Sequence, residues 1–325
     1  MTTSPRFLII GANGQIGTEL AEALAELHGP QAVVTSDLAP EGRLPALRHE
    51  ALDVTDAGAL AEVVKRHGIN QIYLLAAALS ATGEQHPQWA WNLNMGGLLN
   101  VLELARVARL DRVFWPSSIA AFGPTTPTTA AQHSVMDPGT VYGISKLAGE
   151  RWCAWYHAKH GVDVRSLRYP GLISWKTPPG GGTTDYAVDI FHGALKAGRY
   201  TSFLAEHTRL PMMYMPDAIA ATLALMAAPA EAIKQRGSYN LAGFSFSPRE
   251  IADEIARQVP GFTLDCAPDF RQAIAHSWPQ AIDDQAARQD WGWRPRYDLA
   301  AMVRDMLANL GPLLRSQAAT RATSA

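Results

Sequence analysis

The chain has 325 residues, of which 47% are hydrophobic and 18% are charged, a balance typical of a folded globular protein and not of a disordered one. Its 28 basic and 30 acidic residues leave a formal net charge of −2, so nothing favours binding to the phosphate backbone of a nucleic acid. The two cysteines cannot form a disulfide framework, no Cys or His cluster has zinc spacing, and no apolar stretch reaches the roughly 20 residues of a membrane span. We therefore expect a cytoplasmic protein without a membrane segment or a metal site.

The first half of the chain alternates short β-rich runs with longer runs that have helical spacing. Strands are predicted at residues 6–10, 32–36, 71–75, 112–115 and 164–168. Helices are predicted at residues 16–27, 59–66, 93–108 and 142–160. Continuous apolar strands separated by helices indicate a parallel sheet that is covered on both faces. Right-handed crossovers then give an α/β fold with a Rossmann-type, doubly wound sheet.

The pattern becomes irregular after Tyr169, where a smaller, helix-rich part is predicted. Residues 177–184 are rich in proline and glycine, which indicates an exposed loop. Ser247, Pro248 and Glu250 have the pattern of a capped helix start. We predict a Rossmann domain over residues 1–170 with residues 213–244 returning to it, a substrate-binding part over residues 171–212 and 245–315, and a disordered tail over residues 316–325.

Three glycines, Gly11, Gly14 and Gly17, follow the first predicted strand and open the first predicted helix. Glycine at these positions permits a tight turn, close approach of a pyrophosphate, and close packing of the helix on the strand. The helix N-terminus supplies free N–H groups and partial positive charge for the phosphates. This context predicts a dinucleotide site; the alternative is an ordinary strand-to-helix turn.

Asp37 lies 20 residues after Gly17, at the end of the second predicted strand. A carboxylate there can accept hydrogen bonds from the hydroxyls of an adenosine ribose and would repel a 2′-phosphate, so NAD is favoured over NADP. Arg43 is evidence for NADP instead, because a nearby arginine could bind its 2′-phosphate. A solvated acid at a strand end is the alternative reading of Asp37.

Tyr142 and Lys146 are four residues apart, which places both on one side of a helix. A free phenol has a pKa of about 10, and an adjacent ammonium together with a positive nicotinamide would lower it enough for general-base catalysis. Ser117 and Ser118 follow the predicted strand at residues 112–115, at the sheet edge where α/β proteins bind ligands. A serine here can orient a substrate hydroxyl whose proton Tyr142 removes; a plain helix surface is the alternative for the Tyr-Lys pair.

These motifs together resemble the extended short-chain dehydrogenases/reductases. The glycines have that family's Gly-x-x-Gly-x-x-Gly spacing, and Ser117-Ser118-Ile119-Ala120-Ala121-Phe122-Gly123 matches its Ser-Ser-x-x-x-(Tyr/Phe)-Gly pattern, which selects Ser118. The resemblance implies a catalytic set of Ser118, Tyr142 and Lys146. It also implies NAD contacts from Gly11, Asn13, Gly14, Gln15, Ile16, Gly17, Asp37, Leu38, Asp53, Val54, Leu75, Ala76, Ala77, Tyr142, Lys146, Tyr169, Pro170 and Leu172.

Several later segments look like the epimerase-like, metal-independent L-threonine 3-dehydrogenases. They cover residues 169–174, 179–188, 211–217, 277–279 and 283–293, and the Pro-Gly-Gly-Gly-Thr-Thr-Asp-Tyr stretch is the most specific. The resemblance implies NAD-dependent oxidation of the L-threonine β-hydroxyl to 2-amino-3-oxobutanoate. It further implies a homodimer formed through the helices at residues 93–108 and 142–160.

L-Threonine is a small zwitterion, so its site needs donors for the carboxylate and an acceptor for the ammonium. The expected substrate contacts are Ser80, Ser118, Tyr142, Gly182, Thr183, Thr184, Asp185 and Trp278. Asp185 could equally be a helix cap, Ser80 a loop hydroxyl and Trp278 a core residue. The glycine-rich loop could close as a lid that excludes water, or could be a plain flexible connection.

Two other functions stay open at this point. A nucleotide-sugar 4-epimerase or dehydratase would need basic groups for a diphosphate, and Arg168 and Arg209 are available. A non-catalytic dinucleotide sensor would keep the glycine loop but would not need the Ser118, Tyr142 and Lys146 set.

Overall fold

The computed structural model describes residues 4–178 and 180–323, and it describes side chains up to residue 316. Six parallel strands form its main sheet in the order β3-β2-β1-β4-β5-β8. They are β1 (Phe7–Ile10), β2 (Val33–Asp37), β3 (Arg48–Ala51), β4 (Gln71–Leu74), β5 (Arg112–Phe114) and β8 (Val164–Arg165). This order is that of a Rossmann-type sheet and confirms the predicted fold class.

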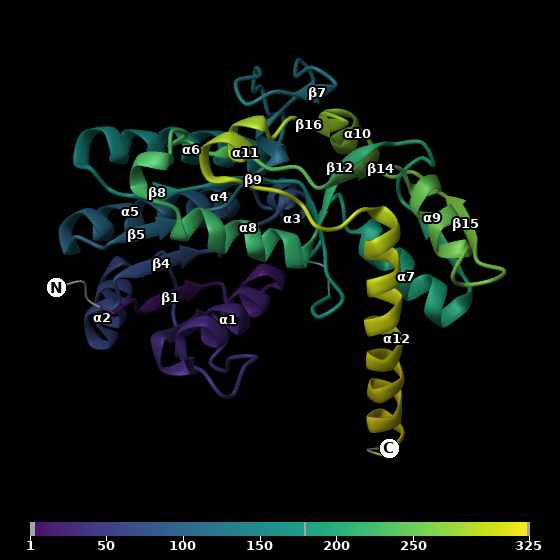
Figure 1. Cartoon of the computed structure of the whole chain (residues 1–325), viewed down its shortest axis with the longest axis horizontal. Helices are drawn as coiled ribbons and strands as arrows, with labels where there is room; N and C mark the ends of the chain where they lie inside the picture. The colour runs from purple at the N-terminus through teal and green to yellow at the C-terminus, as the bar shows by residue number, and fades with distance from the viewer. Residues whose placement is uncertain (1–3, 179, 324–325) are drawn as a thin grey trace.

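Helices cover both faces of this sheet (Figure 1). Leu8 and Ile10 of β1 pack into one buried cluster with residues of α2 (Ala57–His67), α5 (Gly97–Ala108) and α6 (Val141–His160). Phe7 and Ile9 of the same strand point to the other face, into a cluster with α1 (Gln15–His28) and α8 (Met215–Ala227). Because both faces are buried, the strand is apolar throughout, which is why its sequence shows a continuous run.

The predicted helix at residues 93–108 is longer and less regular than expected. It begins with α4 (Pro87–Trp91), passes through a π-helical turn (Asn92–Gly96) and continues as α5. The wide turn lets the Asn94 side chain reach the backbone after β4, where its Oδ1 accepts from the Ala78 N–H at 2.8 Å and its Nδ2 donates to the Ala78 carbonyl at 3.2 Å. Such π-turns are frequent at functional sites.

The strand predicted at residues 164–168 is in fact two strands that belong to different sheets. Ser166 separates β8 from β9 (Leu167–Tyr169), and β9 is the middle strand of a small sheet with β6 (Ser117–Ser118) and β13 (Tyr239–Asn240). The register pairs Ser117 with Arg168 and Ser118 with Tyr169. The switch of sheet therefore fixes the position of the two serines.

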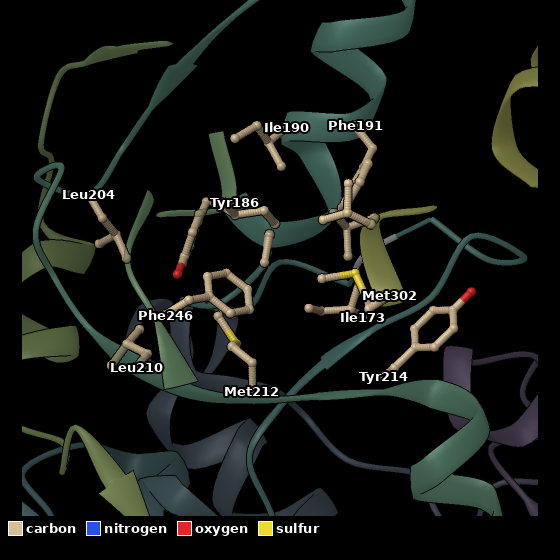
Figure 2. Packing of buried hydrophobic residues seen from close by; sticks show 14 of the residues in the cluster. Ile173, Tyr186, Ile190, Phe191, Leu204, Leu210, Met212, Tyr214, Phe246 and Met302 are labelled. Carbon is tan, nitrogen blue, oxygen red and sulfur yellow. The ribbon is translucent and has the colours of Figure 1, made fainter. Parts of the chain in front are cut away.

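The second half of the chain forms a smaller part beside the main sheet. Tyr186 and Phe191 of α7 (Tyr186–Ala197) pack with Met212, Phe246 and other apolar residues in a separate buried cluster (Figure 2). Ser247 and Glu250 form the expected capping box at the start of α9 (Pro248–Ala256). The elements of this half are β10 (Gly171–Ile173), α7 (Tyr186–Ala197), β11 (Arg199–Ser202), β12 (Leu210–Tyr214), β14 (Phe244–Phe246), α9 (Pro248–Ala256), β15 (Thr263–Cys266), α10 (Arg271–His276), α11 (Gln285–Trp291) and α12 (Leu299–Thr323).

Strand β12 connects the two clusters. Met212 and Tyr214 belong to the cluster of the smaller part, whereas Met213 and Met215 belong to the cluster beneath the main sheet. The chain then enters α8, which lies against α1 (Figure 1). Ala287 of α11 and Trp293 also belong to the cluster of α1 and α8, so α11 packs against the main-sheet side. The predicted division into domains stays a prediction.

The C-terminal segment differs from the expectation. The sequence predicts disorder from Ser316, but α12 continues to Thr323 (Figure 1). This stretch contains several alanines, which have the highest helix propensity, so the helix propagates beyond its packed part. No helix within the described ranges combines the length and the apolarity that a membrane span requires.

Candidate active site

A cavity of about 470 Å³ opens at the carboxyl ends of the main-sheet strands, between the sheet and the smaller part. Most of the residues that the sequence suggests lie on its wall, from both halves of the chain. These are Gly11, Asn13, Gly14, Gln15, Ile16, Gly17, Leu75, Ala77, Ser80, Ser118, Tyr142, Lys146, Tyr169, Pro170, Leu172, Gly182, Thr183, Thr184, Asp185 and Trp278.

Five of the suggested cofactor residues do not line this cavity: Asp37, Leu38, Asp53, Val54 and Ala76. Leu38 is 66% exposed and Val54 is buried under α2 and α5. Asp53 accepts hydrogen bonds from the backbone N–H and the hydroxyl of Thr55, at 2.9 and 2.7 Å. Asp37 lies directly behind the glycine loop, where its Oδ2 accepts from the Asn13 N–H at 3.1 Å.

The glycine loop has the geometry that a pyrophosphate requires. Gly11 has φ +85°, and a Cβ there would lie 2.6 Å from the Ala76 nitrogen, so this position needs glycine. A Cβ at Gly17 would overlap the Gly11 carbonyl, which shows how closely α1 approaches the loop. No described side chain caps α1, whose N-cap is Gly14, and its first turn contains no acidic residue. The free N–H groups of this turn therefore fit the phosphates of a dinucleotide.

Asn13 connects this loop to the residues that follow β2. Its Nδ2 donates to the Glu41 carbonyl at 3.0 Å, and its Oδ1 accepts from the Arg43 N–H at 3.0 Å. Arg43 also lines the cavity, beside the loop that Asp37 supports. Asp37, which favours a free ribose, and Arg43, which could bind a 2′-phosphate, thus both contact Asn13.

The three suggested catalytic residues come from two elements that approach very closely. Thr140 caps α6 by accepting the Gly143 N–H at 3.0 Å, and a Cβ at Gly143 would overlap the Ala120 carbonyl. This approach brings Tyr142 to the end of β6, where its hydroxyl forms a hydrogen bond with the Ser118 side chain. Lys146, one turn further along α6, donates from Nζ to the Pro116 carbonyl at 2.6 Å.

Burial shifts the pKa values of both Tyr142 and Lys146. Burial raises the pKa of Tyr142 to about 12, although the hydrogen bond with Ser118 acts in the opposite direction. Burial also lowers the pKa of Lys146 to about 7. Within the protein alone, desolvation is thus the largest influence on both groups. The predicted lowering of the phenol pKa also requires the nicotinamide charge and stays a prediction. An oxidised nicotinamide in the cavity would add the missing positive charge.

The π-helical turn contributes a residue that sequence reasoning missed. The Asn94 amide donates to Ser145 Oγ at 3.1 Å, and Ser145 in turn donates to the Tyr142 carbonyl at 2.7 Å. Asn94 therefore links the backbone after β4 to the first turn of α6. Nothing in the sequence marks Asn94, because a π-turn has no recognisable sequence pattern.

A buried ion pair lies behind the catalytic residues and was also missed. Glu150 accepts two hydrogen bonds from Arg168, both at 2.8 Å, and a third from Ser117 Oγ at 2.6 Å. Arg168 donates in addition to Asn240 Oδ1 and to the Gln132 carbonyl, both at 2.9 Å. Arg168, considered as a diphosphate ligand for a nucleotide sugar, is thus fully occupied within the protein.

The glycine-rich loop is less exposed than predicted, because both of its ends are buried. Thr177 and Thr183 are only 4% and 1% exposed. The Gln15 side chain donates to the Thr177 carbonyl at 3.2 Å, which attaches the loop to α1, and Ser80 Oγ lies 3.4 Å from Thr183 Oγ1. The residues between them, at 180 and 181, are exposed.

Asp185 holds this loop in place. Its Oδ2 accepts the N–H groups of Gly181 at 2.8 Å and of Gly182 at 2.6 Å. It makes no side-chain capping bond to α7, although it is the N-cap residue of that helix. Burial raises the pKa of Asp185 to about 6, which the two backbone hydrogen bonds only partly offset. The carboxylate is thus a clamp on the glycine loop instead of a helix cap, and its contact with a substrate ammonium stays a prediction.

Comparison with known proteins adds independent information. The family model for the NAD dependent epimerase/dehydratase family matches residues 7–242. An uncharacterized epimerase/dehydratase of Staphylococcus haemolyticus (strain JCSC1435) is 48% identical over 307 residues, which cover 93% of this chain and 96% of the relative.

Two solved structures are also similar along nearly the whole chain. A GalE-like L-threonine dehydrogenase from Cupriavidus necator, in its holo form, is 68% identical with a TM-score of 0.93, over 94% of this chain and 100% of that one. A monomeric L-threonine 3-dehydrogenase from a metagenome database, in its apo form, is 45% identical with a TM-score of 0.92, over 94% and 99% of the two chains.

Proposed function

Because the chain belongs to the NAD-dependent epimerase/dehydratase family, we propose that its cavity binds NAD and oxidises the β-hydroxyl of L-threonine to give 2-amino-3-oxobutanoate. The observation that carries this proposal is the shared cavity. Ser118, Tyr142 and Lys146 line the same space as the glycine loop at the start of α1. Such an arrangement brings a proton acceptor and a dinucleotide to one substrate.

The charge of the cavity wall supports a small zwitterionic substrate over a nucleotide sugar. Among the described lining residues, Arg43 and Lys146 are the basic ones. Arg168 is paired with buried Glu150, and Arg209 pairs with Glu250 at 2.5 Å outside this cavity. Arg43 lies beside the glycine loop, where its N–H donates to Asn13. A diphosphate beyond the nicotinamide would therefore have no arginine to neutralise it, whereas an amino acid needs only hydroxyl and backbone donors.

The protein's part in the reaction is the transfer of one proton. The Ser118 hydroxyl orients the substrate β-hydroxyl, and Tyr142 accepts its proton on the phenolate oxygen. In its protonated form, Lys146 stabilises the phenolate by its charge, because its nitrogen lies near the Tyr142 ring. Bound NAD⁺ supplies a hydride acceptor for the β-carbon and a positive charge that favours the phenolate.

The test is net formation of NADH, followed by absorbance, with NAD⁺ and L-threonine or with a panel of nucleotide sugars. A dehydrogenase accumulates NADH with threonine, whereas an epimerase regenerates its NAD⁺ and shows no net change. Absence of NADH with threonine, together with turnover of a nucleotide sugar, would transfer the assignment to the epimerases. Absence of any turnover would leave a dinucleotide sensor.

We also propose that two copies of the chain associate through α5 and α6. Large apolar side chains are exposed along α6, among them Ile144 at 45%, Trp152 at 39% and Trp155 at 44%, and Trp91 beside α5 is 40% exposed. Apolar side chains gathered on one face are typical of interfaces between subunits. Light scattering at micromolar concentration tests this: twice the 35.2 kDa chain mass is expected, and a monomer, as in the metagenomic relative's name, would refute it.

A reducing compartment such as the cytoplasm suits the two cysteines. Cys153 and Cys266 are both free thiols, and Cys266 is exposed. Disulfides are rare in the cytosol, where thiols are kept reduced. Fractionation of cells that make the protein should recover it with cytoplasmic markers.

A further inference from the structure

One residue lies between the candidate active site and a second cavity. The second cavity has a volume of about 260 Å³ and is lined by residues 205–209 together with Ala275, His276, Trp278 and Gln280. Trp278 is the one described residue that lines both cavities. Trp278 is therefore the partition between the cavity that holds Ser118, Tyr142 and Lys146 and the second cavity.

The partition is buried on an anchored stretch of backbone. Trp278 follows α10, where its backbone N–H donates to the Ala275 carbonyl at 3.2 Å, and the residue is only 9% exposed. It belongs to the same buried cluster as Ile119, which follows Ser118 directly. Further along the chain, the backbone N–H groups of Gln280 and Ala281 donate to the Thr128 carbonyl at 2.9 and 3.1 Å. A side chain packed in a buried cluster cannot move aside for a larger ligand at little cost.

We propose that Trp278 sets the upper size limit of the substituent on the β-carbon of the substrate. This inference rests on the proposed function, and it names the residue that excludes β-hydroxy amino acids larger than threonine. The polar groups of the cavity are needed for the carboxylate, the ammonium and the β-hydroxyl. The β-substituent is the remaining part of the substrate, and it faces the apolar side chain of Trp278. The space beside this side chain fits a methyl group but not an aromatic ring.

The second cavity is large enough to take what the wall excludes. A cavity of about 150 Å³ lined by apolar groups can hold benzene, and the space behind Trp278 is larger than this. Its charged residues are neutralised by ion pairs: Glu206 pairs with Arg249 at 2.8 Å, and Arg209 pairs with Glu250. Removal of the indole would thus join the two cavities and open a pocket that suits an uncharged aromatic substituent.

The experiment compares kcat/KM for L-threonine, its β-ethyl homologue and L-threo-phenylserine in the wild type and in Trp278→Ala. We expect the ratio of phenylserine to threonine to rise at least about tenfold in the variant, the range in which pocket shape discriminates apolar groups. Trp278→Phe keeps an aromatic wall and should raise the ratio much less. His276→Ala enlarges the second cavity but leaves the partition, so its ratio should equal that of the wild type.

The outcomes separate this inference from the proposed function. If the wild type forms no NADH from threonine, the proposed function fails. If the wild type is active but Trp278→Ala lowers kcat/KM for all three substrates by the same factor, Trp278 only supports the fold and the inference is overturned. An increase of the ratio in His276→Ala would also overturn it, because the limit would then lie elsewhere. Should Trp278→Ala not fold, as judged by its melting curve, Trp278→Leu is assayed against the same criteria.

Discussion

The Lys146 nitrogen lies over the face of the Tyr142 ring, 5.3 Å from its centroid, while its hydrogen bond goes to the Pro116 carbonyl. When it is protonated, Lys146 thus acts on the phenol through its charge and not through a direct bond to the phenol oxygen. Burial places the pKa of Tyr142 at about 12 and that of Lys146 at about 7. A phenolate would therefore form only when a further positive charge enters the cavity, which couples proton removal to the presence of the oxidised cofactor.

Substitution of Tyr142 by phenylalanine should remove the proton acceptor and leave the cavity shape almost unchanged. We expect kcat with threonine to fall by about 10³-fold or more, the range typical of a lost general base. The dissociation constant for NAD⁺, measured by calorimetry, should change little, because the glycine loop is untouched. Activity near the wild-type value in this variant would show that another group takes the proton.

Lys146 should make the stability of the protein depend on pH. The pKa of this residue is about 7 in the folded chain and near its ordinary value of 10.5 in the unfolded one. Between these values the unfolded chain binds a proton that the folded chain lacks, so the free energy of unfolding rises with pH, by at most about 1.4 kcal/mol per pH unit. Lys146→Met lacks this contribution, and its urea midpoint should rise less than that of the wild type between pH 7.5 and 9.5. Parallel pH dependence in the two proteins would contradict a neutral Lys146.

Cofactor choice should depend on the opposing charges of Asp37 and Arg43. Replacing Asp37 with serine removes the carboxylate that would repel a 2′-phosphate, while Arg43 stays on the cavity wall. We expect kcat/KM with NADP, relative to NAD, to rise about tenfold or more, which corresponds to about 1.4 kcal/mol. The double variant Asp37→Ser/Arg43→Ala should lose most of this gain. If the double variant retains it, Arg43 plays no part in the choice.

Sequence patterns located those parts of the site that consist of neighbouring residues. The glycine loop, the strands around it and the Tyr142–Lys146 spacing are local, so an apolar run or a helical repeat reveals them. The parts that were missed depend on contacts between distant residues. Arg168 contacts Glu150 and Asn240, which are 18 and 72 residues away. The break at Ser166 separates β8 from β9, because β9 pairs with β6 instead of joining the main sheet. Asn94 depends on a π-turn that tertiary packing imposes on an ordinary helical sequence.

The Glu150–Arg168 pair should be necessary for the stability of the catalytic region. Both side chains are almost fully buried, so removal of one partner leaves an unpaired charge. We expect Arg168→Met to cost about 3–5 kcal/mol in the free energy of unfolding, and the double variant Glu150→Gln/Arg168→Met to cost less than the single one. Chemical denaturation measures both. A double variant that is less stable than Arg168→Met would mean that neutralising the Glu150 side chain does not relieve a buried charge.

Asp185 should determine how mobile the glycine-rich loop is, and hydrogen exchange can read this directly at the two amides that it binds. In Asp185→Ala the Gly181 and Gly182 N–H groups lose their acceptor, so their exchange should accelerate at least about tenfold. A hydrogen bond to a charged group contributes about 1.5–3 kcal/mol, and about 1.4 kcal/mol corresponds to a factor of ten. Asp185→Asn keeps a carbonyl oxygen in this place and should accelerate exchange less.

The same carboxylate makes the effect dependent on pH. With a pKa of about 6, Asp185 becomes protonated as the pH falls through 6, and a neutral carboxyl is a weaker acceptor than a carboxylate. After correction for the intrinsic rate, protection of the two glycine amides should therefore fall between pH 7 and 5 in the wild type and stay constant in Asp185→Asn. If the loop closes as a lid, NAD⁺ and threonine together should raise protection across residues 180–182 at pH 7. Unchanged protection with both ligands would show that the clamp is permanent and that the substrate enters without movement of this loop.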